Sequence, residues 1–295
     1  MRIFLHGSRR KVDALEPALF DRLWNHLTAL CSDGGLSVSR KLYELLAAKR
    51  QLPSWVRPVD RGEVPEADLA VSLGGDGTFL RTAQWVGDSR VPILGVNAGH
   101  LGFLTDFTIA DFLQADAALL GRLRHQPRKL LRVECSEPLP DGCWPYALND
   151  VALLKNDTAS MISVAATVDG MPLTTYQADG LVIATPTGST GYNLSVGGPI
   201  LEPQVDALLL SPVAPHLLAM RPLAVGGSAR LELTVSARKG GFMLSLDGRS
   251  LSIAAGATVI VEAAPFPIIV AQHPEHDFAQ TLRSKLLWGE RPVRQ

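Results

Sequence analysis

Two kinds of hydrophobic pattern alternate along the first third of the chain. Short continuous apolar runs at residues 2–6, 69–73 and 92–96 predict buried strands. Apolar residues that recur every three or four positions predict helices over residues 13–31, 40–49, 78–86 and 111–123. Strands that alternate with helices are typical of a parallel sheet with helices on its faces.

The pattern changes after residue 130 to short strand-like runs. Strands are predicted at residues 130–135, 146–154, 161–168, 181–184, 231–236, 243–246 and 259–262. Asp169-Gly170 and Asp247-Gly248 each stand between apolar runs, and this pair is a strong signal for a β-hairpin. Antiparallel hairpins in series favour a β-sandwich. From residue 275 the apolar positions have helical spacing again.

These patterns predict an α/β plus β fold in three parts. An N-terminal open α/β domain with a parallel sheet is expected over residues 1–124, and a β-rich, sandwich-like domain over residues 125–270. A helical tail over residues 271–295 completes the chain. The basic segment at residues 121–132 lies at the join, where we interpret it as a solvated linker and strand edge.

Composition narrows the class of protein. Apolar residues make up 46% of the 295, which excludes a disordered chain. The 28 basic and 29 acidic side chains give no charge-based reason to expect nucleic acid or an anionic membrane as a partner. Cys31, Cys135 and Cys143 lack the spacing of a disulfide framework or a zinc site, and no apolar run suggests a signal peptide or a membrane span. We therefore expect a cytoplasmic protein.

A glycine-rich turn directly follows the strand predicted at residues 69–73. Gly74, Gly75, Asp76, Gly77 and Thr78 form the sequence GGDGT, and a helix is predicted after it. Such a turn lets backbone N–H groups approach an anion at the positive end of a helix. A carboxylate there suits phosphate chemistry if it holds a metal or accepts a proton from an attacking hydroxyl. The alternative is a helix cap.

Other phosphate motifs are missing from the sequence. The chain has no GxxxxGK[ST], no GxGxxG after a strand, and neither GxSxG nor HExxH. Residues 177–200 instead read QADGLVIATPTGSTGYNLSVGGPI, where hydroxyls and glycines are dense. That density suits a polar ligand with many hydrogen-bonding groups, and Tyr192 could stack on a flat ring. The alternative is a long loop between sheets.

Taken together, these motifs resemble the NAD kinase family. GGDGT, NAGHLGFLTDF at 97–107, LND at 148–150, ADGLVIATPTGSTGYNLSVGGPI and the C-terminal HP…TLRSKLLWG occur in the family's order over nearly the whole chain. GGDGT alone is less specific, because lipid kinases and 6-phosphofructokinases share it. The resemblance implies a phosphofructokinase-like N-terminal domain and a tail that packs back on it.

The resemblance also implies an activity and its ligands. Members transfer the terminal phosphoryl group of ATP, or in some cases of polyphosphate, to the 2′-hydroxyl of the adenosine ribose of NAD, giving NADP. Mg²⁺ would arrive with ATP rather than bind a dedicated site. NAD and ATP would be the only partners besides further copies of the chain, in a homodimer or homotetramer.

The family motifs assign roles to single residues. Asp76 corresponds to the catalytic base, and the phosphate turn corresponds to Gly74, Gly75, Gly77 and Thr78. The positions that correspond to NAD contacts are Asp76, Gly77, Arg81, Asn149, Asp150, Ser160, Gln177, Asp179, Thr190, Gly191, Tyr192, Asn193, Ser195 and Arg249.

Three of these positions depart from the usual family residue. Asp150 replaces a Glu, Gly191 replaces an Ala, and Gln177 replaces a residue that is often basic. For Ser160 and Arg249 a plain surface role is an equal alternative. Two other functions remain as hypotheses: a lipid or sugar kinase of the wider GGDGT group, and a regulator that binds NAD(P) without turnover.

Overall fold

The computed structural model describes residues 1–31, 35–99, 102–156, 161–238 and 240–286. Its contacts divide the chain into two compact units, 1–127 together with 268–295, and 128–267. We call them unit 1 and unit 2. The domain limits predicted from the sequence differ from these by a few residues. None of the described helices is long and apolar enough to cross a membrane.

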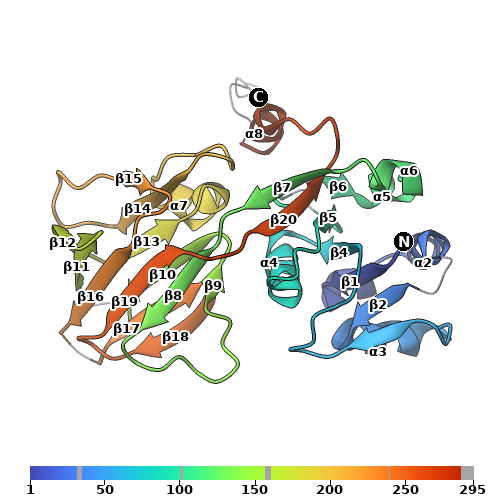
Figure 1. Ribbon diagram of the computed structural model, residues 1–295, viewed down its shortest axis with the longest axis horizontal. Helices are drawn as coiled ribbons and strands as arrows, with labels where there is room; N and C mark the ends of the chain where they lie inside the picture. Colours follow the sequence, from blue (N-terminus) through green and yellow to red (C-terminus); the bar gives the residue numbers. More distant parts are fainter. Residues whose placement is uncertain (32–34, 100–101, 157–160, 239, 287–295) are drawn as a thin grey trace, which may run out of the picture. The chain divides into compact units, whose positions relative to one another are not determined.

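Unit 1 contains the α/β sheet that the sequence predicts (Figure 1). Its central strand order is β3-β2-β1-β4-β5, continued by β20 and β7, with β6 paired to β5. β1, β2, β3, β4, β5, β6 and β20 all pair in parallel. The strands are β1 (Ile3–Gly7), β2 (Leu36–Ser39), β3 (Arg57–Val59), β4 (Leu69–Gly74), β5 (Ile93–Asn97), β6 (Phe107–Thr108), β7 (Arg124–Arg128) and β20 (Ile268–Gln272).

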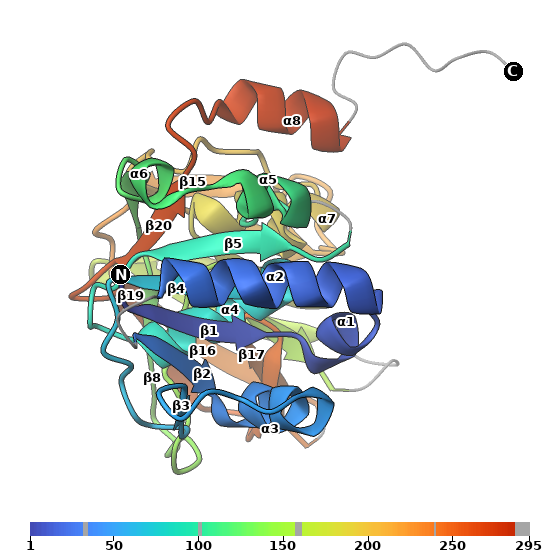
Figure 2. The same ribbon diagram turned by 90° about the vertical axis from the view of Figure 1, so that its right-hand side faces the viewer.

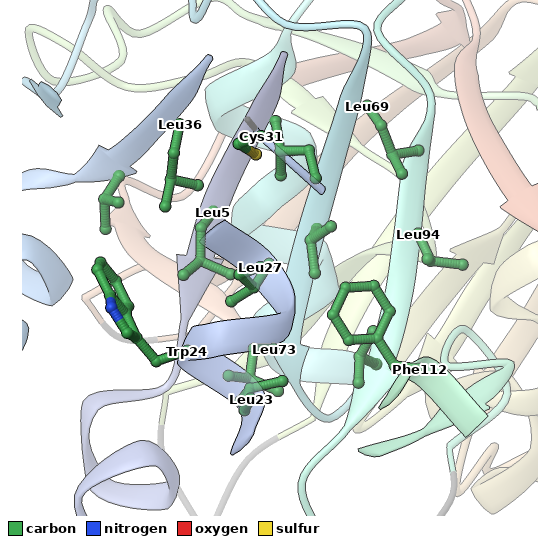
Figure 3. Packing of buried hydrophobic residues seen from close by; sticks show 14 of the residues in the cluster. Leu5, Leu23, Trp24, Leu27, Cys31, Leu36, Leu69, Leu73, Leu94 and Phe112 are labelled. Atoms are coloured by element: carbon green, nitrogen blue, oxygen red, sulfur yellow. The ribbon is translucent and has the colours of Figure 1, made fainter. Parts of the chain in front are cut away.

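Helices cover both faces of this sheet (Figure 2). They are α1 (Arg9–Asp13), α2 (Pro17–Leu30), α3 (Arg40–Lys49), α4 (Asp76–Val86), α5 (Ile109–Gln114) and α6 (Ala117–Leu120). A further helix, α8 (Phe278–Leu286), follows β20 and has no buried residue. Leu5 of β1 packs in one cluster with α2, α3 and α5, as Figure 3 shows for Leu27 and Phe112. The neighbouring Phe4 contacts Trp85 of α4, with ring centroids 5.7 Å apart. Because successive side chains along β1 point to opposite faces of the sheet, Leu5 and Phe4 pack against helices on different faces.

Three predicted helices have different limits in the structure, and the one predicted over 78–86 begins two residues earlier, at Asp76. The helix predicted over 13–31 begins at Pro17, because proline is suited to the first position of a helix. The single helix predicted over 111–123 is wrong. The chain is extended at Ala115, and the Asp116 side chain accepts a hydrogen bond from Leu119 N (2.7 Å) to begin the separate helix α6.

Unit 2 is a sandwich of two six-stranded antiparallel sheets, as predicted (Figure 1). One sheet has the order β15-β14-β13-β10-β17-β18 and the other β12-β11-β16-β19-β8-β9, and they share one apolar core. The strands are β8 (Leu131–Cys135), β9 (Tyr146–Ala147), β10 (Asp150–Lys155), β11 (Ile162–Val168), β12 (Met171–Ala178), β13 (Gly180–Ala184), β14 (Ala207–Val213), β15 (Leu223–Gly226), β16 (Leu231–Ala237), β17 (Phe242–Leu246), β18 (Arg249–Ile253) and β19 (Thr258–Ala263).

Both Asp-Gly hairpins are confirmed. Asp247 and Gly248 have φ values of 49° and 78° between β17 and β18, and Asp169 and Gly170 have 52° and 79° between β11 and β12. Two successive positive φ values are what a type I′ turn requires. The strand predicted over 146–154 is interrupted, because residues 148–149 lie between β9 and β10.

The core of unit 1 gives a stability prediction. Leu27 is 2% exposed within the α2 cluster, whereas Val64 of the same unit is 55% exposed. We expect Leu27→Ala to lower the free energy of unfolding by about 2–5 kcal/mol, since it leaves a cavity that the surrounding side chains only partly fill. Denaturant titration measures this, with Val64→Ala as the control. Equal shifts for the two variants would contradict this packing.

Candidate functional site

The GGDGT motif forms the turn between β4 and α4. Gly74 ends the strand and Asp76 is the first residue of the helix. A Cβ atom on Gly74 would lie 2.2 Å from Oγ1 of the buried Thr78, so only glycine permits this close approach. The cap residue is Gly75, and no side chain caps the helix. The alternative that Asp76 caps the helix is therefore wrong.

The Asp76 carboxylate is held by a neighbouring loop. Oδ2 accepts a hydrogen bond from Phe103 N (2.7 Å) and Oδ1 accepts one from Leu104 N (3.0 Å). A Cβ atom on Gly102 would lie 1.8 Å from Oδ1, so the backbone comes this close only at glycine. Thr105 Oγ1 in turn accepts hydrogen bonds from Gly102 N (2.9 Å) and Asn97 Nδ2 (3.1 Å). The carboxylate is thus fixed in one orientation.

The C-terminal segment of unit 1 contacts the same loop. Asp106 accepts hydrogen bonds from His273 N and His276 Nδ1, both at 2.7 Å. Burial opposes the charge of Asp106, but these hydrogen bonds outweigh it and lower its pKa. Lys285 of α8 lies over the Phe103 ring, with Nζ 4.9 Å from the centroid. Burial lowers the pKa of Lys285, against the opposite effect of Asp76 and Asp106. Sequence reasoning did not identify this lysine.

Arg81 is exposed on the next turn of α4 and faces the end of β1. Burial, and secondarily the charge of Arg81, lower the pKa of His6 to about 4. His6 is therefore neutral at pH 7, and its Nδ1 lies 2.9 Å from Ser39 Oγ. Arg81 thus adds its positive charge at the edge of the sheet where β1 and β4 end.

In unit 2, Asp247 organises the segment that contains Asn149 and Asp150. Its carboxylate accepts hydrogen bonds from the backbone N–H groups of Leu148 (2.8 Å), Asn149 (2.8 Å) and Asp150 (3.2 Å). The positive φ of Asp247 in its hairpin turn directs the side chain to these groups. Sequence reasoning read Asp247 only as a turn residue, because nothing local reveals a partner about a hundred residues away.

The TGSTGY segment lies against Asn149 and Asp150. It forms a 3₁₀ turn (Thr187–Thr190) and the short helix α7 (Tyr192–Ser195). A Cβ atom on Gly188 would lie 1.9 Å from Asn149 O, so the two backbones touch. At Gly191 a Cβ would lie 3.5 Å from Asn149 Nδ2 and 3.7 Å from Asp150 Oδ2, which is ordinary contact and leaves room for the family's usual Ala. Asn149 Oδ1 is buried and has no hydrogen-bond partner within the described residues.

Asp150 holds its proton near neutral pH. Burial, and then the charge of Asp247, raise its pKa to about 7, against a stabilising backbone hydrogen bond from Tyr192. Burial raises the pKa of Asp247 as well, but three amide N–H groups stabilise its charge. Asp150 therefore changes charge close to pH 7.

Two further predicted residues lie close to this group. Asp179 pairs with Lys155, with Oδ1 and Nζ 2.8 Å apart. Tyr192 is 37% exposed, and burial raises the pKa of its phenol, with added contributions from the charges of Asp150 and Asp179. The structure thus brings together, within unit 2, Asn149, Asp150, Asp179, Gly191 and Tyr192.

Some of the remaining predicted residues form hydrogen bonds within the protein, and others have exposed side chains. Asn193 is fully buried, donating to Ser189 O and Pro199 O (both 3.0 Å) and accepting from Ser211 Oγ (2.6 Å), so it supports the turn from within. Arg249 donates to Trp144 O (2.7 Å) and Tyr146 O (2.5 Å), which anchors β9. Thr190 is half-buried, whereas Ser195 and Gln177 are exposed. Ser160 lies outside the described residues.

The raised pKa of Asp150 gives a pH prediction. Because the folded state binds this proton more tightly than the unfolded state, the contribution of Asp150 to wild-type stability falls as pH rises from about 4 to about 7. Asp150→Asn removes this loss, so we expect its advantage in unfolding free energy over wild type to be roughly 2 kcal/mol larger at pH 8 than at pH 5. Denaturant titrations at both pH values measure this. An advantage that does not change with pH would show that Asp150 ionises at its ordinary pKa.

Comparison of the chain with known proteins identifies the family to which it is similar. Residues 15–122 match the model of the ATP-NAD kinase N-terminal domain, and residues 148–272 match that of the ATP-NAD kinase C-terminal domain. The chain is 36% identical over 288 residues to the NAD kinase of Bacteroides fragilis, covering 97% of each chain. It is 44% identical over 224 residues to the NAD kinase of Porphyromonas gingivalis, covering 75% of this chain and 76% of the relative.

Two solved structures share the fold. An NAD kinase from Archaeoglobus fulgidus, determined in complex with ATP, has a TM-score of 0.66 at 27% identity, over 93% of this chain and 95% of that one. A yeast NADH kinase complexed with NADH has a TM-score of 0.83 at 24% identity, over 100% of this chain and 90% of that one. From both domain matches and the full-length relative, the chain belongs to the NAD kinase family.

Proposed function

We propose that this chain transfers the terminal phosphoryl group of ATP to the 2′-hydroxyl of the adenosine ribose of NAD, giving NADP and ADP. Family membership supports the reaction, and one feature of the structure supports its mechanism. That feature is the Asp76 carboxylate, which two backbone N–H groups hold in one orientation at the glycine-rich turn.

Asp76 has the chemistry of a general base in this reaction. As the ribose oxygen forms a bond to the terminal phosphorus, its proton passes to the carboxylate, and the bond from that phosphorus to the bridging oxygen breaks to release ADP. Each carboxylate oxygen accepts one N–H and keeps a further lone pair for this proton. Gly74, Gly75, Gly77 and Thr78 supply the turn and the helix N-terminus that favour an anion.

We assign the contacts with NAD mainly to unit 2. The unpartnered Asn149 Oδ1 and the Asp150 carboxyl are groups that a ribose diol satisfies by donating hydrogen bonds. Tyr192 offers an exposed ring face for stacking. Asp179 and Lys155 form a charged pair beside them, which suits the polar parts of the dinucleotide.

Mg²⁺ enters this proposal with ATP. In the described part of the chain, no three His, Cys, Asp or Glu side chains stand close enough to hold a metal ion. Bound to the phosphates, the ion neutralises charge that develops on them. Polyphosphate presents the same kind of anion and is the alternative donor.

We also propose that the protein acts in the cytoplasm as a homodimer or homotetramer. Its three cysteines are free, as in proteins of reducing compartments. Met171 (71% exposed) and Leu173 (37%) lie on β12, which is the outer strand of its sheet. Exposed apolar side chains on an edge strand favour association.

The comparisons do not favour a lipid or sugar kinase, nor a regulator without turnover.

Asp76→Asn tests the assignment of the base. Asparagine keeps the shape but cannot accept the proton, so we expect kcat to fall by about 10²–10⁴-fold while the Kd for NAD changes by less than about threefold. NADP formation and calorimetry measure the two quantities. Asp88→Asn, at an exposed position after α4, is the control. If binding and turnover fall together, Asp76 has a structural role instead.

Asn149→Ala tests the acceptor site. We expect the Kd for NAD to rise about tenfold, because the amide no longer pairs with the ribose. Asn156→Ala, at an exposed position just after β10, serves as the matched control and should leave the Kd unchanged. An unchanged Kd for Asn149→Ala would remove this residue from the NAD site.

A further inference from the structure

Lys11 lies on α1, which follows β1 at the topological switch point of the unit 1 sheet. In the order β3-β2-β1-β4-β5, the connection after β1 runs to one side and the connection after β4 runs to the other. Ligands of such sheets bind outside the carboxyl ends of the strands at this switch point. α1 follows β1 directly, and Ser8 N donates to Leu73 O (2.9 Å), which fixes the start of α1 against the end of β4.

The ammonium group of Lys11 lies beside two glycine turns. Its Nζ is 3.1 Å from the point that a Cβ atom would occupy at Gly75, and 3.1 Å from the corresponding point at Gly99. Gly75 follows β4, and Gly99 follows the adjacent parallel strand β5. These distances place the flexible end of Lys11 directly beside both turns. The positive charge of its ammonium group therefore stands at the GGDGT turn.

This charge has no partner among the described residues. No acidic side chain there pairs with Lys11, whereas its neighbour Asp13 is paired with Lys49 at 2.9 Å. Asp76, the carboxylate of the turn, accepts backbone N–H groups of the 102–105 loop instead. The half-buried ammonium group of Lys11 is hydrated on its exposed side and can pair with an anion that binds at the turn.

We propose that Lys11 binds the phosphate chain of the donor, next to the phosphoryl group that is transferred. This inference rests on the proposed function and adds a cation that the motif analysis lacked. The sequence has no P-loop lysine, so the glycine turn by itself offers only N–H groups to a strongly anionic triphosphate. The ammonium of Lys11 supplies a point charge that pairs with phosphate oxygens during transfer.

The test compares Lys11→Met with Lys11→Arg. Methionine keeps the length and removes the charge, so kcat/KM for ATP should fall about 10- to 100-fold, whereas the Kd for NAD should stay within about twofold. Arginine should restore part of the loss. Arg22→Met, on the exposed side of α2, removes the same charge elsewhere in unit 1 and should have no effect.

A second measurement separates contact with phosphate from a general change in structure. Inorganic tripolyphosphate should compete with ATP, and we expect its Ki to rise in Lys11→Met by a factor similar to the loss for ATP, while inhibition by adenosine should not change. The proposal is overturned if Lys11→Met leaves the ATP and tripolyphosphate constants unchanged, if NAD binding weakens equally, or if Arg22→Met has the same effect. A wild-type protein that makes no NADP would instead refute the proposed function, and tripolyphosphate binding measured by calorimetry would still test Lys11.

Discussion

The candidate chemistry of unit 1 depends on two hydrogen bonds, from Phe103 N and Leu104 N to the Asp76 carboxylate. They form because β4 and β5 are adjacent and parallel, so the segments that leave their carboxyl ends meet at one edge of the sheet. A carboxylate directly after a glycine turn would otherwise sample several rotamers in solvent. Here the backbone selects one, and Thr105, Asp106 and α8 hold that backbone in turn.

Unit 2 uses the same physical device for a different purpose. The Asp247 carboxylate accepts three backbone N–H groups from residues 148–150 and thereby interrupts the strand at the point where Asn149 is presented. Its negative charge also makes ionisation of Asp150 less favourable. A turn residue therefore fixes the position of one predicted ligand group and, in addition to burial, raises the pKa of the next.

The sequence predicted those features that local patterns encode. Continuous apolar runs revealed β4 and β5, and Asp-Gly pairs revealed two hairpins, because burial and positive φ each leave a local signature. β12 was missed, since most of its side chains are exposed and it forms only by pairing with β11. β20 was missed for another reason: its partner β5 lies far away in the sequence, across the whole of unit 2.

The sequence predicted which kinds of polar residue stand at the candidate site. It did not predict which of their side chains already form hydrogen bonds within the protein. Arg249 and Asn193 have polar side chains suited to a ligand, yet backbone carbonyls and Ser211 occupy their hydrogen-bonding groups. Lys11 stood in a basic segment, SRRK, and no motif distinguished it from its neighbours. What distinguishes it is the position of its ammonium group beside two glycines that follow other strands, Gly75 after β4 and Gly99 after β5. The sequence shows that these glycines are present, but only the fold shows which charged side chain lies beside them.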